Sequence, residues 1–178
     1  DAPKFESAKI LAEAILSKRD WAAKAGAVQG AMIEKYEFAP LSYGGSSLAP
    51  FDCLSDIIRS FTGIVKDIRR MPEKVEAACE ALIPLLIKKG ISPRSSRYMR
   101  TFFPLHMAPY LKEKDFARFY WPSFEKLLRA YNEKGVGCKL FVEGDWMAKI
   151  DYLTQLEDCM EMQFEFGDAR LVKEKVGG

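Results

Sequence analysis

The stretch "CKLFVEGDW", residues 138–146, runs from an apolar segment directly into an acid, a glycine and a second acid. Residues 138–142 are short and mostly apolar, which predicts a buried strand. Glu143, Gly144 and Asp145 then form either a plain turn or part of a site. The fold decides between the two, because strand ends carry catalytic residues in particular architectures such as parallel barrels.

The segments around this strand alternate between predicted strands and predicted helices. Residues 98–104 are aromatic and apolar, and residues 160–166 alternate between apolar and polar side chains, so both are expected to be strands. Helices are expected over residues 112–119, from Pro122 to Gly135, and over residues 147–156. This alternation favours an α/β fold whose three strands are parallel neighbours in chain order, joined by right-handed crossovers.

The first 90 residues and the last ten are predicted to be mainly helical. A Gly/Ser/Pro-rich loop over residues 41–51 separates the first helix from the others. Proline followed by an acid at Pro72-Glu73 is a start signal, and Asp168 is the expected cap of the last helix. The expected helices cover residues 5–35 with breaks near Gly26 and Gly30, residues 54–68, residues 72–90, and the residues from Asp168 to Val176.

Composition bounds the class of protein. The chain has 178 residues, of which 48% are hydrophobic and 29% are charged, and its formal net charge is +2. The basic residues are scattered, so no nucleic-acid partner is expected. No apolar run approaches the ~20 residues of a membrane helix, and no signal peptide is visible. The four separated cysteines fit buried free thiols in a reducing cytoplasm.

Two longer segments resemble the uroporphyrinogen decarboxylase superfamily. "FARFYWPSFEKLLRAYNEKGVGCKLFVEGDWMAKIDYLTQL", residues 116–156, has the Trp-Pro that opens a helix, followed by a glycine and a strand that ends in a glycine-containing turn. "GSSLAPFDCLSDIIRSFTGIVKDIRRMPEKVEAACEAL", residues 45–82, resembles the preceding part of that family, with its Gly/Pro loop and its Pro-Glu helix start. The resemblance covers about residues 40–178.

The resemblance implies a (β/α)8 barrel with parallel strands. Such a barrel typically takes about 250 residues, so we expect residues 1–178 to form a partial TIM barrel, as one domain that is an internal fragment of a longer protein. The start at Asp1 and the end at Gly178 are consistent with this expectation. A partial barrel would expose an apolar strand edge, so self-association into a homo-oligomer is expected.

The resemblance further implies methyl transfer that involves a corrinoid (cobalamin), acting as substrate or carrier, with a small-molecule or tetrapyrrole substrate. A corrinoid protein is the corresponding partner. Many methyltransferases of this superfamily bind zinc through a His-x-Cys pair at the end of the strand that matches residues 138–142. Aligned through Gly144, that pair falls on Phe141 and Glu143, so no metal site is expected there.

Two alternatives stay open. The chain could belong to a uroporphyrinogen decarboxylase of tetrapyrrole biosynthesis, which is a carboxy-lyase. It could instead be an inactive fragment, or a subunit that needs another chain. An arginine-rich signature upstream would favour the decarboxylase.

The candidate site residues follow the predicted strands, because active sites of parallel barrels lie at the carboxyl ends of strands. Glu143, His106 and Glu165 are the candidates for acid–base catalysis. Substrate or cofactor binding is assigned to Asp145, Trp146 and Tyr43, with a helix cap as the alternative for Asp145 and core packing as the alternative for Trp146. In a barrel, Glu143 is a site residue rather than a turn residue.

Overall fold

The computed structural model describes residues 2–37, 44–156 and 160–177, and it divides into two compact units, residues 1–42 and 43–178. Helix α1 (Ala2–Tyr36) forms the first unit. It runs unbroken through Gly26 and Gly30, so the breaks expected there are wrong. A glycine inside a helix costs only about 1 kcal/mol relative to alanine, and the alanine-rich sequence around both positions sustains the helix.

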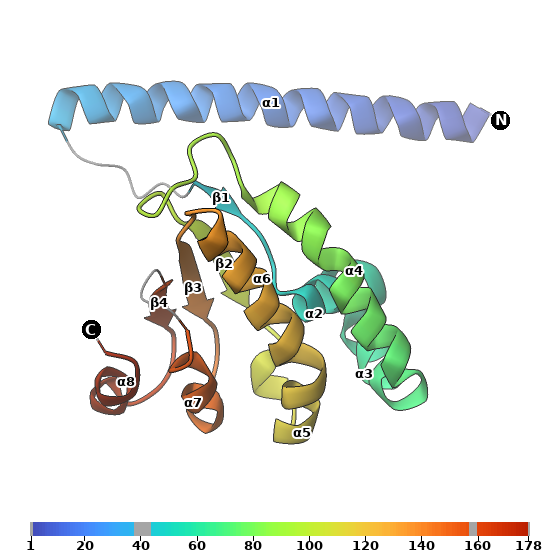
Figure 1. Cartoon of the computed structure of the whole chain (residues 1–178). Coiled ribbons are helices and arrows are strands. Elements are labelled where there is room, and N and C mark those ends of the chain that lie inside the picture. Colours follow the sequence, from blue (N-terminus) through green and yellow to red (C-terminus); the bar gives the residue numbers. More distant parts are fainter. Residues whose placement is uncertain (1, 38–43, 157–159, 178) are drawn as a thin grey trace. The chain divides into compact units, whose positions relative to one another are not determined.

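The second unit is built on a four-stranded parallel sheet (Figure 1). Its strands, which lie side by side in chain order, are β1 (Gly45–Ser46), β2 (Thr101–Leu105), β3 (Cys138–Val142) and β4 (Met160–Phe164). Phe103 pairs with Leu140, and Leu140 pairs with Met162. The expected α/β class and the expected parallel order of the last three strands are therefore confirmed.

Strand β2 begins three residues later than predicted. The Ser96 hydroxyl accepts a hydrogen bond from the backbone N–H of Met99 at 2.9 Å, which bends residues 96–99 into a turn. Tyr98 is 82% exposed in this turn. Local side-chain-to-backbone hydrogen bonds of this kind compete with strand formation, and apolar patterning does not reveal them.

The helices begin close to their sequence signals. Helix α4 starts at Pro72, and the Asp168 carboxylate caps α8 by accepting the N–H of Arg170 at 2.8 Å, so both start signals are confirmed. The helical segments of the second unit are α2 (Pro50–Cys53), the π-helical turn η1 (Leu54–Arg59), α3 (Ser60–Arg70), α4 (Pro72–Gly90), η2 (Ala108–Tyr110), α5 (Glu113–Asp115), the π-helical turn η3 (Phe116–Tyr120), α6 (Trp121–Glu133), η4 (Met147–Lys149), α7 (Ile150–Leu153) and α8 (Ala169–Val176).

The helix expected over residues 112–119 and the helix expected from Pro122 form one uninterrupted helical run. Helical backbone continues from α5 through η3 into α6. Proline cannot donate the hydrogen bond of an α-helical turn, and its ring crowds the preceding carbonyl groups. The wider π-helical turn η3, directly before Trp121 and Pro122, accommodates both effects within one continuous helical segment.

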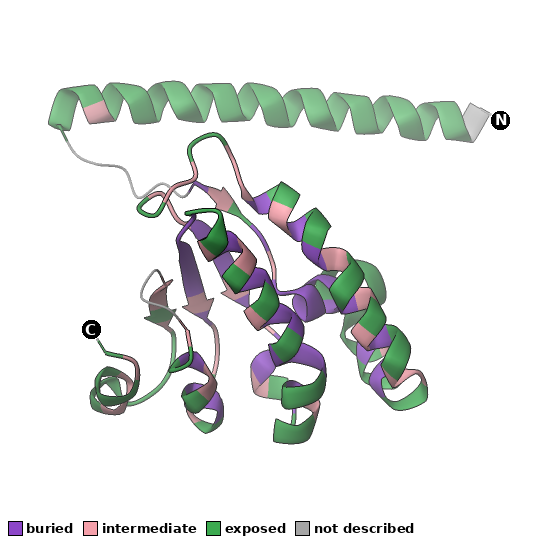
Figure 2. Ribbon diagram, in the orientation of Figure 1, coloured by how far each residue is buried: buried purple, intermediate pink, exposed green. Residues whose placement is uncertain are grey.

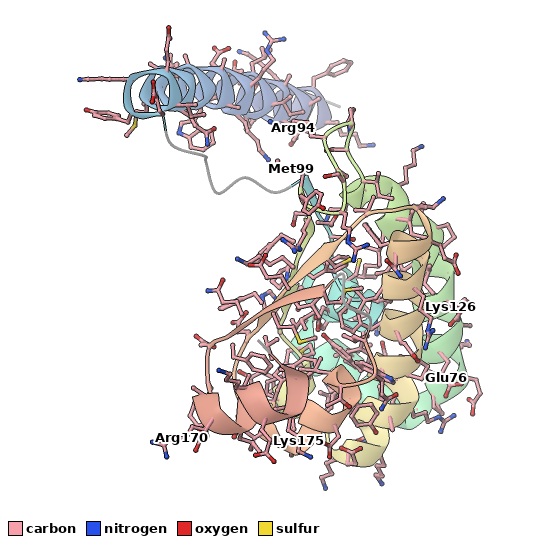
Figure 3. The ribbon with its side chains drawn as sticks, turned by 60° about the vertical axis from the view of Figure 1, so that its left-hand side comes forward. Glu76, Arg94, Met99, Lys126, Arg170 and Lys175 are labelled. Carbon is pink, nitrogen blue, oxygen red and sulfur yellow. The ribbon has the colours of Figure 1, made fainter. Side chains whose placement is uncertain are left out.

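Helices α4 and α6 lie side by side against one face of the sheet (Figure 1). Phe103, Leu140 and Val142 from the strands are fully buried in the core, together with Phe124 and Leu127 from α6 (Figure 2). Lys126 of α6 pairs with Glu80 of α4 on the outer surface of this helical layer (Figure 3). In the described part of the chain, no helix combines the length and the apolarity that crossing a membrane requires.

Candidate active site

The carboxyl ends of β2 and β3 bring His106 and Glu143 together. His106 directly follows β2, Glu143 directly follows β3, and the two strands pair in register up to Leu105 and Val142. The His106 Nε2 lies 3.0 Å from a carboxylate oxygen of Glu143. Two residues that are 37 positions apart in sequence therefore meet because parallel neighbours end at the same edge of the sheet.

A second carboxylate contacts the other side of the same imidazole ring. This carboxylate belongs to Asp56 in the π-helical turn η1. Its Oδ2 lies 2.7 Å from the Nδ1 of His106. The hydroxyl of Ser55 donates to the other Asp56 oxygen at 2.6 Å and orients that carboxylate. His106 is thus held between Asp56 and Glu143, with its side chain 38% exposed to solvent.

This arrangement favours the imidazolium form of His106. Partial burial lowers the pKa of the imidazole. The hydrogen bond to Asp56 and the negative charges of Glu143, Asp56 and Asp52 outweigh burial, and they raise the pKa of His106 above its ordinary value of 6.5. The ring therefore carries a proton over part of the neutral range, while one edge of it stays open to solvent.

Behind His106 lies a fully buried carboxyl group, that of Asp52 in helix α2. Its Oδ1 accepts the backbone N–H of Met107 at 3.0 Å. Its Oδ2 accepts the backbone N–H of His106 at 3.2 Å and the hydroxyl of Tyr120 at 2.8 Å. Burial raises the pKa of Asp52 to about 7, although the hydrogen bonds from Tyr120 and the backbone oppose this shift.

Glu165, which directly follows β4, joins the same edge of the sheet. Its Oε2 accepts the backbone N–H of Gly144 at 2.8 Å. Gly144 has φ +71°, and a Cβ there would lie 2.9 Å from the ring of Pro109, so this position requires glycine. Glu165 therefore holds the turn that carries Glu143.

The three residues assigned to binding differ in their placement. Asp145 accepts a hydrogen bond from the backbone N–H of Met147 at 2.9 Å, but the N-cap of the following helix η4 is Trp146, so the capping role considered for Asp145 is wrong. Trp146 is fully buried and lies edge-on against Phe116, with ring centroids 5.6 Å apart, so it packs in the core and has no face open to a ligand. Tyr43 lies outside the described residues.

The buried carboxyl group near His106 belongs to Asp52 and not to Glu143. The side chain of Glu143 is 41% exposed, so the neighbourhood of Phe141 does not desolvate it. Asp52 supplies the buried carboxyl group, and Asp56 supplies the carboxylate that contacts the imidazole. Neither residue was among the candidates predicted from the sequence. The available signal was "PFDCLSD", residues 50–56, where two acids follow the short first strand within an apolar stretch.

The described ranges contain no cluster of three or more His, Cys, Asp or Glu side chains arranged to hold a metal ion. Both nitrogens of His106 face carboxylates instead. Chemically, this set can hold a proton on the imidazole and exchange it with a bound molecule on the solvent side, beside Glu143.

We expect NMR to detect the proton on His106 directly, because the chain contains only one histidine. The imidazole resonance should titrate with a midpoint above 6.5, and Asp56→Asn should lower that midpoint, since it removes both a charge and a hydrogen bond. Glu133→Gln, at the far end of α6, is the control and should leave the midpoint unchanged. A wild-type midpoint below 6.5 would contradict the imidazolium arrangement.

Comparison with models of known protein families, with curated proteins and with solved structures finds no match for this chain.

Proposed function

We propose that His106, Asp56 and Glu143 form the proton-transfer centre of an enzyme of the uroporphyrinogen decarboxylase superfamily, a cytoplasmic methyltransferase that uses a corrinoid. The observation that carries the proposal is the imidazole held between two carboxylates at the carboxyl ends of adjacent parallel strands. A positioned group that keeps a proton near neutral pH is what general acid–base catalysis requires.

We further propose that the sheet is part of a (β/α)8 barrel. Its strands are all parallel and follow chain order, and α4 and α6 lie on one face of it. A doubly wound sheet would reverse its strand order and carry helices on both faces. A barrel keeps chain order and places its helices outside, with its active site at the strand ends where His106, Glu143 and Glu165 lie.

In methyl transfer, the acceptor loses the proton of its thiol or hydroxyl group as it gains the methyl group from the corrinoid. Glu143 can pass that proton to the Nε2 of neutral His106, and the imidazolium so formed can return it in the reverse direction. Asp56 stabilises the imidazolium from the other side, at Nδ1. The residues of this chain thus supply proton transfer, and the corrinoid supplies the methyl group.

Exposed apolar side chains close in sequence to Asp56 and His106 support a large, flat substrate. Ile57 follows Asp56 directly and is 65% exposed. Phe61 and Tyr110 are 49% and 70% exposed, and their rings meet edge to face with centroids 5.5 Å apart. Exposed aromatic and aliphatic groups beside a polar centre are suited to contact a macrocycle. We therefore propose that Ile57, Phe61 and Tyr110 contact the bound substrate or cofactor, which is the role that the sequence analysis assigned to Trp146.

Electrostatics favour methyl transfer over decarboxylation. Asp56 and Glu143 flank His106, and Glu165 binds the backbone of Gly144 next to Glu143. Uroporphyrinogen carries many carboxylates, and like charges at short range disfavour binding. Decarboxylation remains the second candidate because a protonated imidazole can also donate the proton that replaces the lost carboxyl group.

The test is a comparison of two substrates with the full-length protein under anaerobic conditions. Methylcobalamin with a panel of small thiols should be demethylated, as followed by its visible absorbance, and uroporphyrinogen III should release no CO₂. Glu143→Gln should reduce methyl transfer about 10²-fold or more, and Glu133→Gln should not. CO₂ release without demethylation would support the decarboxylase, and turnover of neither substrate would support an inactive or incomplete chain.

A further inference from the structure

Asp52 connects three elements that meet beneath His106. It belongs to α2, and it accepts hydrogen bonds from the backbone at the end of β2 and from Tyr120 of the π-helical turn η3. His106 and Met107, whose N–H groups it accepts, join β2 to η2. The carboxyl group is fully buried, so water does not replace a hydrogen bond that is lost there.

The ionised and protonated forms of Asp52 cannot hold this junction equally well. An ionised carboxylate only accepts hydrogen bonds, which suits three converging donors. A protonated carboxyl group carries one O–H donor, so at least one contact has to rearrange. Tyr120 can turn its hydroxyl to accept, whereas the backbone N–H groups of His106 and Met107 can only donate.

We infer that Asp52 is a positioning residue whose ionised carboxylate holds the backbone of His106 where the imidazole reaches Asp56 and Glu143. Its kinetic consequence rests on the proposed function of His106. Asp52 itself contacts neither solvent nor the open side of the ring, so it acts through the position and the charge of His106.

Asp52 changes its charge near neutral pH. Burial raises its pKa to about 7, the negative charge of Asp56 adds to this rise, and the donors Tyr120, Met107 and His106 oppose it. The titratable groups that face it are Asp56 and Cys53 on its own helical segment, Cys79 on α4, His106 after β2 and Tyr120 on η3. Below about pH 7, the junction holds a neutral carboxyl group and His106 loses a nearby negative charge.

The experiment records the NMR titration of His106 and the pH profile of methyl transfer in the full-length protein, for wild type, Asp52→Asn and Tyr120→Phe. In wild type, the resonance should show a second inflection near pH 7, and turnover should fall on the acid side of that pH. Asp52→Asn should remove both features and lower turnover about 10- to 100-fold at pH 8 because His106 is misplaced. Tyr120→Phe removes one donor to the carboxylate and should move both features to higher pH.

The results for the two variants test whether Asp52 positions His106. An unchanged second inflection in Asp52→Asn, or a Tyr120→Phe profile identical to that of wild type, would overturn it. If Asp52→Asn does not fold, the direction of the Tyr120→Phe shift carries the test, because phenylalanine preserves the packing against Phe116. If His106→Gln retains turnover, the proposed function fails, but a second inflection that depends on Asp52 would still support the positioning role.

Discussion

Replacing His106 with glutamine should reduce the proposed methyl-transfer turnover of the full-length protein by about 10²- to 10⁴-fold, the usual contribution of general acid–base catalysis. Glutamine can still hydrogen bond to Asp56 or Glu143, but it cannot carry a transferable proton near neutral pH. His106 is the only histidine in the chain, so no second imidazole can replace it. The measurement is single-turnover demethylation of methylcobalamin, which separates the chemical step from product release.

The same substitution should change the melting temperature little. The ion pairs of His106 lie at the solvent-facing edge of the sheet, with the histidine side chain 38% exposed, and exposed pairs contribute at most about 1 kcal/mol. Glu133→Gln is the matched control for both readouts, since Glu133 is exposed at the opposite end of the sheet. Wild-type turnover in His106→Gln would exclude the imidazole as the proton carrier and would leave Glu143 as the leading candidate.

The second large effect is the pH dependence of stability that Asp52 contributes. The pKa of Asp52 is about 7 in the folded protein, whereas the ordinary pKa of an aspartate, which applies to the unfolded chain, is 3.8. Between these values the folded form binds a proton that the unfolded form lacks, so this contribution to stability falls as pH rises from about 4 to about 7. The difference in pKa corresponds to roughly 4 kcal/mol, at 1.36 kcal/mol for each unit.

Asp52→Asn removes this titration. The difference in unfolding free energy between wild type and Asp52→Asn should therefore change by roughly 4 kcal/mol between about pH 4 and about pH 8, in favour of the variant at the higher pH. Denaturant unfolding at a series of pH values measures it. Glu133→Gln should keep the wild-type slope. A constant difference across the series would show that Asp52 is ionised with an ordinary pKa in the folded chain.

Sequence reasoning predicted part of the candidate site. It placed His106, Glu143 and Glu165 after three strands, and a parallel sheet brings such strand ends to one edge. It missed Asp52 and Asp56 because they belong to a helical segment after a strand of only two residues, Gly45–Ser46, which leaves no periodic signal. It assigned Trp146 to ligand binding, but the structure buries this side chain. Whether a tryptophan is buried depends on neighbours that are distant in sequence, so the local sequence did not reveal it.

By itself, the sequence determined the strands β3 and β4, the starts of α4 and α8, and hence a parallel α/β fold. Local patterns are sufficient there, since apolar alternation, proline at a first helical position and an aspartate cap act within a few residues. Only the tertiary structure decided that His106 lies between Asp56 and Glu143 and that the buried carboxyl belongs to Asp52. Burial and the pairing of charges depend on how η1, β2 and β3 pack together, and residues 50 positions apart carry no local signal of that contact.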